Sequence, residues 1–274
     1  LKVILTGLGG DELFGGYDRY FDGFAVEHRF RMLPQWIKRG VSRLGKTVLP
    51  AKYGNRIASN LKDQQNRYLH RISVFDEAAL EKGLGMSTGE PINLNREFAS
   101  ASGRDTANRL LFVDHLTYLP DEILHLTDRM SMAVSLEART PFLDYRLVQC
   151  ALTMPSQYKM DQRSRRWKTV LKEASRGRVP DSIIERPKWG FGSPIKNWIE
   201  GKLRRHVGDL LNDDCQLVSQ GLVGRESLSR YLAHSLPGEE MRRQQRLWNL
   251  LVLEIWMRVF VDGKGKKPSF GLGG

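Results

Sequence analysis

The hydrophobic pattern at the start of the chain predicts one strand followed by a glycine-rich turn. Val3, Ile4 and Leu5 form a short apolar run, which is typical of a strand buried on both faces. Gly7, Gly9 and Gly10 interrupt this run, and glycines allow positive φ angles and the close approach of another molecule. We therefore expect a strand over residues 1–6, a tight loop, and then the N-terminus of a helix.

Most of the later apolar positions recur at helical spacing. The expected helices cover residues 106–119, 120–136, 145–154, 165–174 and 239–260, and one more begins at residue 194. Residues 83–95 have the composition of a loop. Few further strand candidates follow, so the sheet that the first strand should join is expected to be encoded before Leu1 or supplied by another chain. The sequence opens in this strand, and its first methionine is Met32.

Composition places the chain among ordinary globular proteins. Its 274 residues are 41% hydrophobic and 27% charged, which suits one large domain or two smaller ones. Cys150 and Cys215 are too few for a disulfide framework or a zinc site, and we expect Cys150 in a helix core. The sequence offers no apolar run long enough to span a membrane. These features predict a reduced, cytoplasmic protein.

The net charge of +12 has two interpretations. It could indicate a nucleic-acid partner or an anionic substrate, or it could reflect solvated helix faces and an exposed basic tail. The basic residues are spread along the chain, few aromatic residues lie between them, and the sequence lacks the signature of a nucleic-acid module. The pattern therefore favours solvated faces and disfavours a nucleic-acid partner.

Three stretches contain residues suited to chemistry. In the first, residues 4–18, Asp11 could hold Mg²⁺ on a phosphate, or the stretch is an ordinary turn with a capping acid. In the second, residues 128–144, Arg129 and Glu137 are too far apart to be neighbours on a helix, so each would need a partner elsewhere. The alternative is that structural ion pairs hold this helix against the following loop, residues 140–142. In the third, residues 186–199, Lys188 could neutralise phosphate charge, or it is a surface lysine.

Together the three stretches resemble the glutamine-dependent asparagine synthetases. That family has a "GxGxDExFGGY" loop, an "SLExRxPFLD" segment and an "RxKxGF" loop in this order, which here are residues 7–17, 135–144 and 186–191. Residues 168–171 fit between the second and third motifs. The resemblance implies the α/β fold of the PP-loop ATP pyrophosphatases, related to the adenine nucleotide alpha hydrolases. This piece of that fold is expected to be mostly α-helical, with one or few parallel-type strands.

The resemblance also implies a reaction and a site. ATP activates a carboxylate, that of aspartate in the family, as an acyl-adenylate, and ammonia released from glutamine attacks it. The family's pattern implies that Lys188 and Asp11 are catalytic and that Asp11 also binds Mg²⁺. The residues that would line the ATP site are Thr6, Gly7, Gly9, Gly10, Asp11 and Glu12. Glu137, Arg139 and Asp144 match a motif expected to build the surroundings of the site.

Two departures from the family's pattern shape the expectation. Leu8 stands where well-studied members have a glutamate, which favours a carboxylate other than aspartate. The family's "SGGxDS" loop and N-terminal glutaminase cysteine do not occur in this sequence, so partner segments should supply the PP-loop and the glutaminase. We expect residues 1–262 to be the C-terminal part of the synthetase domain and residues 263–274 a flexible tail. A β-lactam-synthetase-like cyclase and a non-catalytic basic binding protein remain alternatives.

Overall fold

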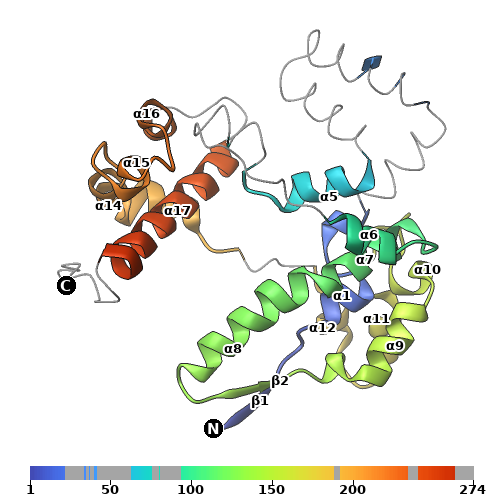
Figure 1. The fold of residues 1–274 in the computed structure, drawn as a ribbon. Helices are drawn as coiled ribbons and strands as arrows, with labels where there is room; N and C mark the ends of the chain where they lie inside the picture. Colours follow the sequence, from blue (N-terminus) through green and yellow to red (C-terminus); the bar gives the residue numbers. More distant parts are fainter. Residues whose placement is uncertain are drawn as a thin grey trace. The chain divides into compact units, whose positions relative to one another are not determined.

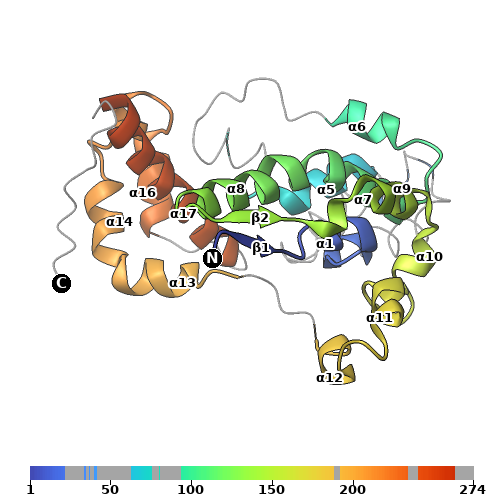
Figure 2. The same ribbon diagram turned by 90° about the horizontal axis from the view of Figure 1, so that it is seen from below.

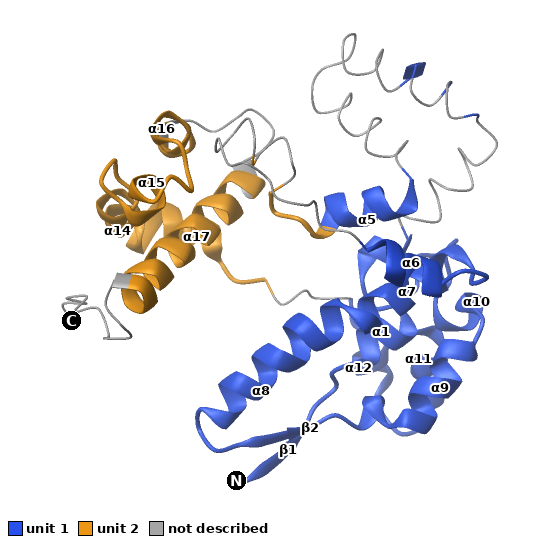
Figure 3. Cartoon of the chain, in the orientation of Figure 1, with its two compact units in different colours: residues 1–71, 93–188 blue, residues 72–92, 189–274 orange. Residues whose placement is uncertain are grey.

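The computed structural model describes residues 1–21, 34, 37, 40–41, 63–75, 80, 94–187, 192–233 and 240–262. The chain divides into two compact units (Figure 3). Unit 1 comprises residues 1–71 and 93–188, and unit 2 comprises residues 72–92 and 189–274. The expected boundary after residue 262 stays a prediction, because residues 263–274 lie outside the described part of the chain.

Unit 1 is largely helical with a small sheet (Figure 1). Its elements are β1 (Val3–Leu5), α1 (Gly10–Phe14), α5 (Gln64–Ile72, which ends on the first residue of unit 2), α6 (Asn95–Ser100), α7 (Thr106–Leu116), the π-helical turn η2 (Leu119–Leu124), α8 (His125–Met132), β2 (Glu137–Arg139), the 3₁₀ turn η3 (Pro141–Leu143), α9 (Tyr145–Thr153), α10 (Ser156–Lys159), α11 (Thr169–Ser175) and α12 (Asp181–Ile184).

The described elements of unit 2 are all helices. Its elements are α13 (Ile195–Asn197), η4 (Trp198–Lys202), α14 (Arg204–Leu210), α15 (Gln216–Ser219), α16 (Arg225–Ala233), α17 (Glu240–Trp256) and η5 (Met257–Asp262). The apolar stripe of the longest predicted helix is confirmed, because Leu247, Leu250 and Leu251 are buried in the core of this unit. Glu254 interrupts the stripe and is fully buried; its carboxylate accepts hydrogen bonds from the backbone N–H groups of Gln216 and Leu217 at 3.1 and 3.0 Å.

The predicted parallel strand is confirmed over the shorter range Val3–Leu5. The expectations that it is buried on both faces and that its partner strand comes from outside this sequence are wrong, because Leu5 is 74% exposed and β2 belongs to this chain. β1 pairs in parallel with β2, with Val3 opposite Glu137 and Leu5 opposite Arg139, and α8 lies along β2 (Figure 2). The expectation of a helix to residue 136 is wrong, because α8 ends at Met132 and Ser135 takes a positive φ of 57° in a turn. This turn reverses the chain so that β2 can lie beside β1.

Other helix predictions are confirmed with changed bounds. α7 and α9 form where the apolar stripes predict them, and the Asp144 side chain caps α9 by accepting from the backbone N–H of Arg146 at 3.0 Å. The basic helix begins at Thr169, four residues late, because Asp161 and Arg166 form an antiparallel bridge ahead of it. Cys150 is exposed, so its predicted place in the core is wrong. The predicted loop at 83–95 falls almost entirely outside the described residues.

The apolar packing around α1 positions the candidate site. Leu13 and Phe14 are buried and pack with Ala151 of α9, and Phe142 and Leu143 of η3 cover them. Short helices gain most of their stability from such packing, so α1 is held by its apolar face and leaves the opposite face to polar residues. In the described residues, the helices are too short or too polar to cross a membrane.

Candidate functional site

The glycine loop lies at the carboxyl end of β1. The backbone N–H of Thr6 donates to the carbonyl of Arg139 at 2.8 Å, and the Thr6 hydroxyl donates to the same oxygen at 3.3 Å. Parallel strands place their carboxyl ends at one edge of the sheet, which is where ligands bind in open α/β folds. Gly9 has a φ of 85°, and a Cβ there would lie 2.3 Å from Leu143, so only glycine fits at this point of the loop.

Asp11, at the start of α1, forms an ion pair with Lys168. Asp11 Oδ1 lies 3.0 Å from Lys168 Nζ, and the two side chains are 25% and 29% exposed, so the pair is accessible. Lys168 immediately precedes α11 and takes a positive φ of 51°, which is uncommon for a residue other than glycine. This backbone geometry directs a cation at the carboxylate of the predicted metal ligand.

Glycine at position 16 leaves the space that the Asp11 carboxylate occupies. A Cβ on Gly16 would lie 1.6 Å from Asp11 Oδ1 and 2.8 Å from Lys168 Cε. The backbone N–H groups of Gly15 and Gly16 both donate to the carbonyl of Asp11, at 3.0 and 2.9 Å. The turn after α1 therefore holds both the backbone and the side chain of Asp11.

Glu12 is turned into the protein and differs in environment from Asp11. Its side chain is 2% exposed and accepts a hydrogen bond from the Tyr17 hydroxyl at 2.6 Å. Burial raises the pKa of the Glu12 carboxyl, and the hydrogen bond from Tyr17 offsets part of that rise. Through this hydrogen bond, the buried Glu12 connects α1 to Tyr17, which follows the glycine loop. Its predicted contact with the nucleotide stays a prediction.

A buried carboxylate anchors the residues that follow the loop. Asp114 of α7 is fully buried and accepts hydrogen bonds from Arg19, Tyr20 and Tyr68. The guanidinium of Arg19 lies 4.3 and 4.4 Å from the ring centroids of Tyr17 and Tyr118, which are cation–π distances. Because Tyr17 also braces Glu12, this cluster ties the far end of the glycine loop to α7.

The second predicted stretch builds the wall of the site. Arg139 and Glu137, both on β2, form an exposed ion pair at 2.9 Å, so Glu137 finds its partner two residues along its own strand. Hydrogen bonds from Arg146 lower the pKa of the Asp144 carboxyl to about 2 while it caps α9. These contacts support a structural role for the motif. Lys188 lies outside the described residues, so its predicted approach to Asp11 is not addressed by the structure.

The donor set fits Mg²⁺ that is bound mainly through phosphate. Among the described positions, no three His, Cys, Asp or Glu side chains form a group that could hold a metal ion. Mg²⁺ in phosphate sites commonly takes one or two carboxylates and completes its shell with phosphate oxygens and water. The single accessible carboxylate of Asp11 is consistent with that mode and not with an all-protein metal cage.

The order of the three motifs and the site around Asp11 agree with a match of most of the chain to one family. Residues 1–258 match the model of the asparagine synthase family. The chain is a member of this family. The asparagine synthase domain has the PP-loop ATP pyrophosphatase fold, so the helices and the parallel pair β1–β2 described above are a part of that fold.

The curated relatives are similar across nearly the whole chain. Asparagine synthetase (glutamine-hydrolyzing) 1 of Bacillus subtilis is 24% identical over 266 residues, covering 96% of this chain and 41% of that protein. A putative asparagine synthetase (glutamine-hydrolyzing) of Mycobacterium bovis is 28% identical over 270 residues, covering 96% and 40%. Asparagine synthetase (glutamine-hydrolyzing) 3 of B. subtilis is 32% identical over 268 residues, covering 94% and 38%. The chain thus spans about two-fifths of the length of these relatives. No solved structure matches it.

Proposed function

We propose that this chain is part of an ATP-dependent ligase of the asparagine synthase family that forms an amide from a carboxylate and ammonia. One observation supports this most: the carboxylate of Asp11, on the glycine loop after β1, is accessible and lies 3.0 Å from the ammonium of Lys168. A carboxylate and a cation at the edge of a parallel sheet suit a metal-bound phosphate group.

In the proposed reaction, ATP converts the substrate carboxylate into an acyl-adenylate and releases pyrophosphate; ammonia derived from glutamine then displaces AMP. Asp11 would hold Mg²⁺, which supplies positive charge to the leaving pyrophosphate. Lys168 would add a second positive charge beside it. Gly7, which is exposed and has nothing within 4 Å of a Cβ, would let the phosphates approach the backbone, whereas Gly9 and Gly10 are buried against Leu143 and Phe142. Lys188 would stabilise charge that develops in the transition state.

We propose a carboxylate substrate that differs from aspartate at the position of the α-ammonium group. Leu8 is half-buried in the loop and offers only apolar contacts, where well-studied members of the family have a glutamate. A leucine cannot accept a hydrogen bond from an α-ammonium group. The proposed substrate is therefore a carboxylate with an apolar or uncharged group where aspartate has its α-ammonium group.

Other segments would complete the site. None of the eight side chains of α8, all of them described, is buried, and Leu126, Met130 and Val134 are 55, 63 and 73% exposed. Leu126 and Met130 are spaced four apart on α8 and so lie on one face of the helix, and Val134 follows in the turn after it. Together they expose apolar surface that suits a protein partner. We propose that PP-loop and glutaminase segments of the complete protein cover it, and that the isolated chain forms no AMP from ATP and aspartate with ammonia supplied.

The test uses the protein expressed from the complete open reading frame that contains this sequence. We expect AMP and pyrophosphate to form only when ATP, Mg²⁺ and a carboxylate from a panel are all present, with product amide dependent on ammonia or glutamine. Asp11→Asn should abolish this, whereas Asp18→Asn, which removes a carboxylate that is 69% exposed, should not. Product formed without ammonia would favour the cyclase alternative; no nucleotide turnover, with salt-sensitive binding to a generic duplex, would favour the basic binding protein.

A further inference from the structure

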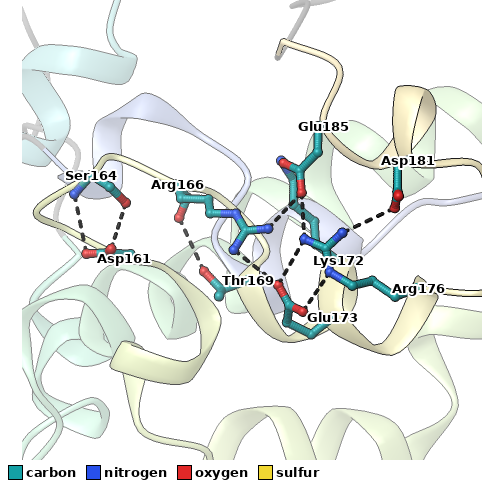
Figure 4. A network of polar contacts seen from close by, with 9 residues as sticks. All are labelled: Asp161, Ser164, Arg166, Thr169, Lys172, Glu173, Arg176, Asp181 and Glu185. Carbon is teal, nitrogen blue, oxygen red and sulfur yellow. Dashed lines mark hydrogen bonds and ion pairs between the residues drawn. The ribbon is translucent and has the colours of Figure 1, made fainter.

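Two arginines and two glutamates form a closed ring of alternating charges on the surface of unit 1 (Figure 4). Arg166 lies 3.1 Å from Glu173 and 2.8 Å from Glu185, and Arg176 lies 2.8 Å from each of the same two glutamates. Both guanidinium groups donate to the same oxygen of Glu185, Oε1. Lys172 lies 3.5 Å from the other oxygen of Glu185. We name the two arginines and two glutamates, without Lys172, the charge ring.

The charge ring joins two segments that lead into the proposed site. Arg166 ends a tight turn closed by hydrogen bonds from Ser164 to Asp161, and it precedes the site residue Lys168 by two positions. Glu185 directly follows α12 and begins the segment Glu185-Arg186-Pro187, after which Lys188 comes next in the sequence. The ring therefore connects Arg166, which lies two residues before Lys168, to the described residues that precede Lys188 in the sequence.

Apolar packing alone holds α12 weakly. This helix has four residues, and Ile184 is its one buried side chain, whereas Ile183 is 52% exposed. Single exposed ion pairs contribute little to stability, but a network in which each charge has several partners holds its geometry better. Hydrogen bonds from Arg176 lower the pKa of Glu173 and Glu185, in keeping with both glutamates being charged within the ring.

We propose that Glu185 is a positioning residue for the amide-forming reaction. Through Arg166 and Arg176 it fixes residues 185–187 against the start of α11, where Lys168 contacts Asp11, and so helps to hold Lys168 in place. The proposal rests on the proposed function. It assigns Glu185 no contact with substrate, because it acts through the backbone it anchors.

The experiment compares Glu185→Gln with Asp181→Asn. Asp181 is 76% exposed on the same short helix and pairs with Arg176 at 3.2 Å without belonging to the ring, so its variant removes one charge and one ion pair but leaves the ring closed. Amide hydrogen exchange is measured at residues 184–186 in the protein from the complete open reading frame, together with kcat and the KM for ATP. A third variant, Glu185→Asp, keeps the charge with a shorter side chain.

We expect Glu185→Gln to speed exchange at residues 184–186 about tenfold. It should also lower kcat by about ten- to hundredfold with little change in the KM for ATP, because misplacing a group by about 1 Å has effects of this size. Asp181→Asn should change neither quantity more than about twofold, and Glu185→Asp should recover part of kcat. Raising the salt concentration from about 0.05 to about 0.5 M should reproduce the faster exchange in the wild type, because exposed charges are screened.

Two results would overturn the inference. Unchanged exchange in Glu185→Gln would show that the ring does not hold this segment. Faster exchange with an unchanged kcat would reduce the ring to a purely structural role. If the wild-type protein forms no amide from any carboxylate, the proposed function has failed on its own, and the exchange measurement still decides whether Glu185 anchors residues 184–186.

Discussion

Replacing Gly16 by alanine should move the Asp11 carboxylate without changing the chemistry of either charged residue. The new methyl carbon would lie 1.6 Å from Asp11 Oδ1, and real Cβ contacts shorter than 3.0 Å essentially never occur. The oxygen must therefore shift by more than about 1 Å, a displacement that can cost about 100-fold in rate, or about 2.7 kcal/mol of transition-state stabilisation. Lys168 must move as well, because its Cε lies 2.8 Å from the same point.

The stability of the variant should change little, because opposing effects nearly cancel. The atoms that meet the methyl group are the ends of two side chains that are 25 and 29% exposed and can swing outward. Losing their ion pair costs about 0.2–1 kcal/mol, and removing a glycine from the unfolded chain returns about 0.4–1 kcal/mol. Gly16 also does not have the positive φ of Gly15, so alanine introduces no backbone strain there.

The assay measures kcat/KM for ATP in the protein from the complete open reading frame, and urea unfolding of the same variants. Gly208→Ala is the matched control, since nothing lies within 4 Å of a Cβ at this position of α14. The control should gain about 0.5–1 kcal/mol of stability and keep its activity. Wild-type kcat/KM in Gly16→Ala would refute the placement of Asp11. A stability loss above about 3 kcal/mol would refute the argument that its neighbours can yield.

Three further variants test other parts of the account. Asp114→Asn should lower the free energy of unfolding by about 3–5 kcal/mol, because the Arg19 charge stays buried without its partner, whereas the exposed Asp121→Asn should change it by less than about 0.5 kcal/mol; urea titration measures both. Burial lowers the pKa of Lys159 to about 8, below its unfolded value of 10.5, so between these values the unfolded chain binds more protons and stability should rise with pH. Lys159→Met should flatten that rise between about pH 8 and pH 10.5, and an equal slope in both proteins would contradict the assignment. Lys188→Ala should lower kcat about 100- to 1000-fold and change the KM for ATP less, and arginine at this position should not restore the rate fully.

The sequence predicts the parts of the fold that depend on local pattern. The apolar run at Val3–Leu5, the capping residue Asp144 and the stripe of the helix that begins at Glu240 each signal their element through neighbouring residues. The two helices form because short-range preference and burial agree, whereas the strand is only half-buried at Val3 and Ile4 and is exposed at Leu5. The glycine loop before Asp11 is also predictable, because a positive φ at Gly9 needs glycine.

The parts that depend on distant neighbours are not predictable in this way. β2 has the sequence Glu-Ala-Arg, which lacks any strand pattern, and it is a strand because β1 lies beside it. The ion pair between Asp11 and Lys168 joins residues far apart in the chain. The apolar and basic pattern around Lys168 suggests a basic helix, and the family resemblance adds only that residues 168–171 fit between two motifs. The contact with Asp11, which a sequence does not reveal, is the feature that sets this lysine apart from its basic neighbours.

The measurement that tests the central claim most directly is carboxylate-dependent AMP formation by the protein from the complete open reading frame. Wild type, Asp11→Asn and Asp18→Asn are assayed with ATP, Mg²⁺, ammonia and a panel of carboxylates that includes aspartate. The account predicts AMP, pyrophosphate and an amide in equal amounts from the wild type and from Asp18→Asn, and a loss of about 100-fold or more in Asp11→Asn. Equal turnover in all three proteins, or ATP breakdown that ignores every carboxylate, would contradict it.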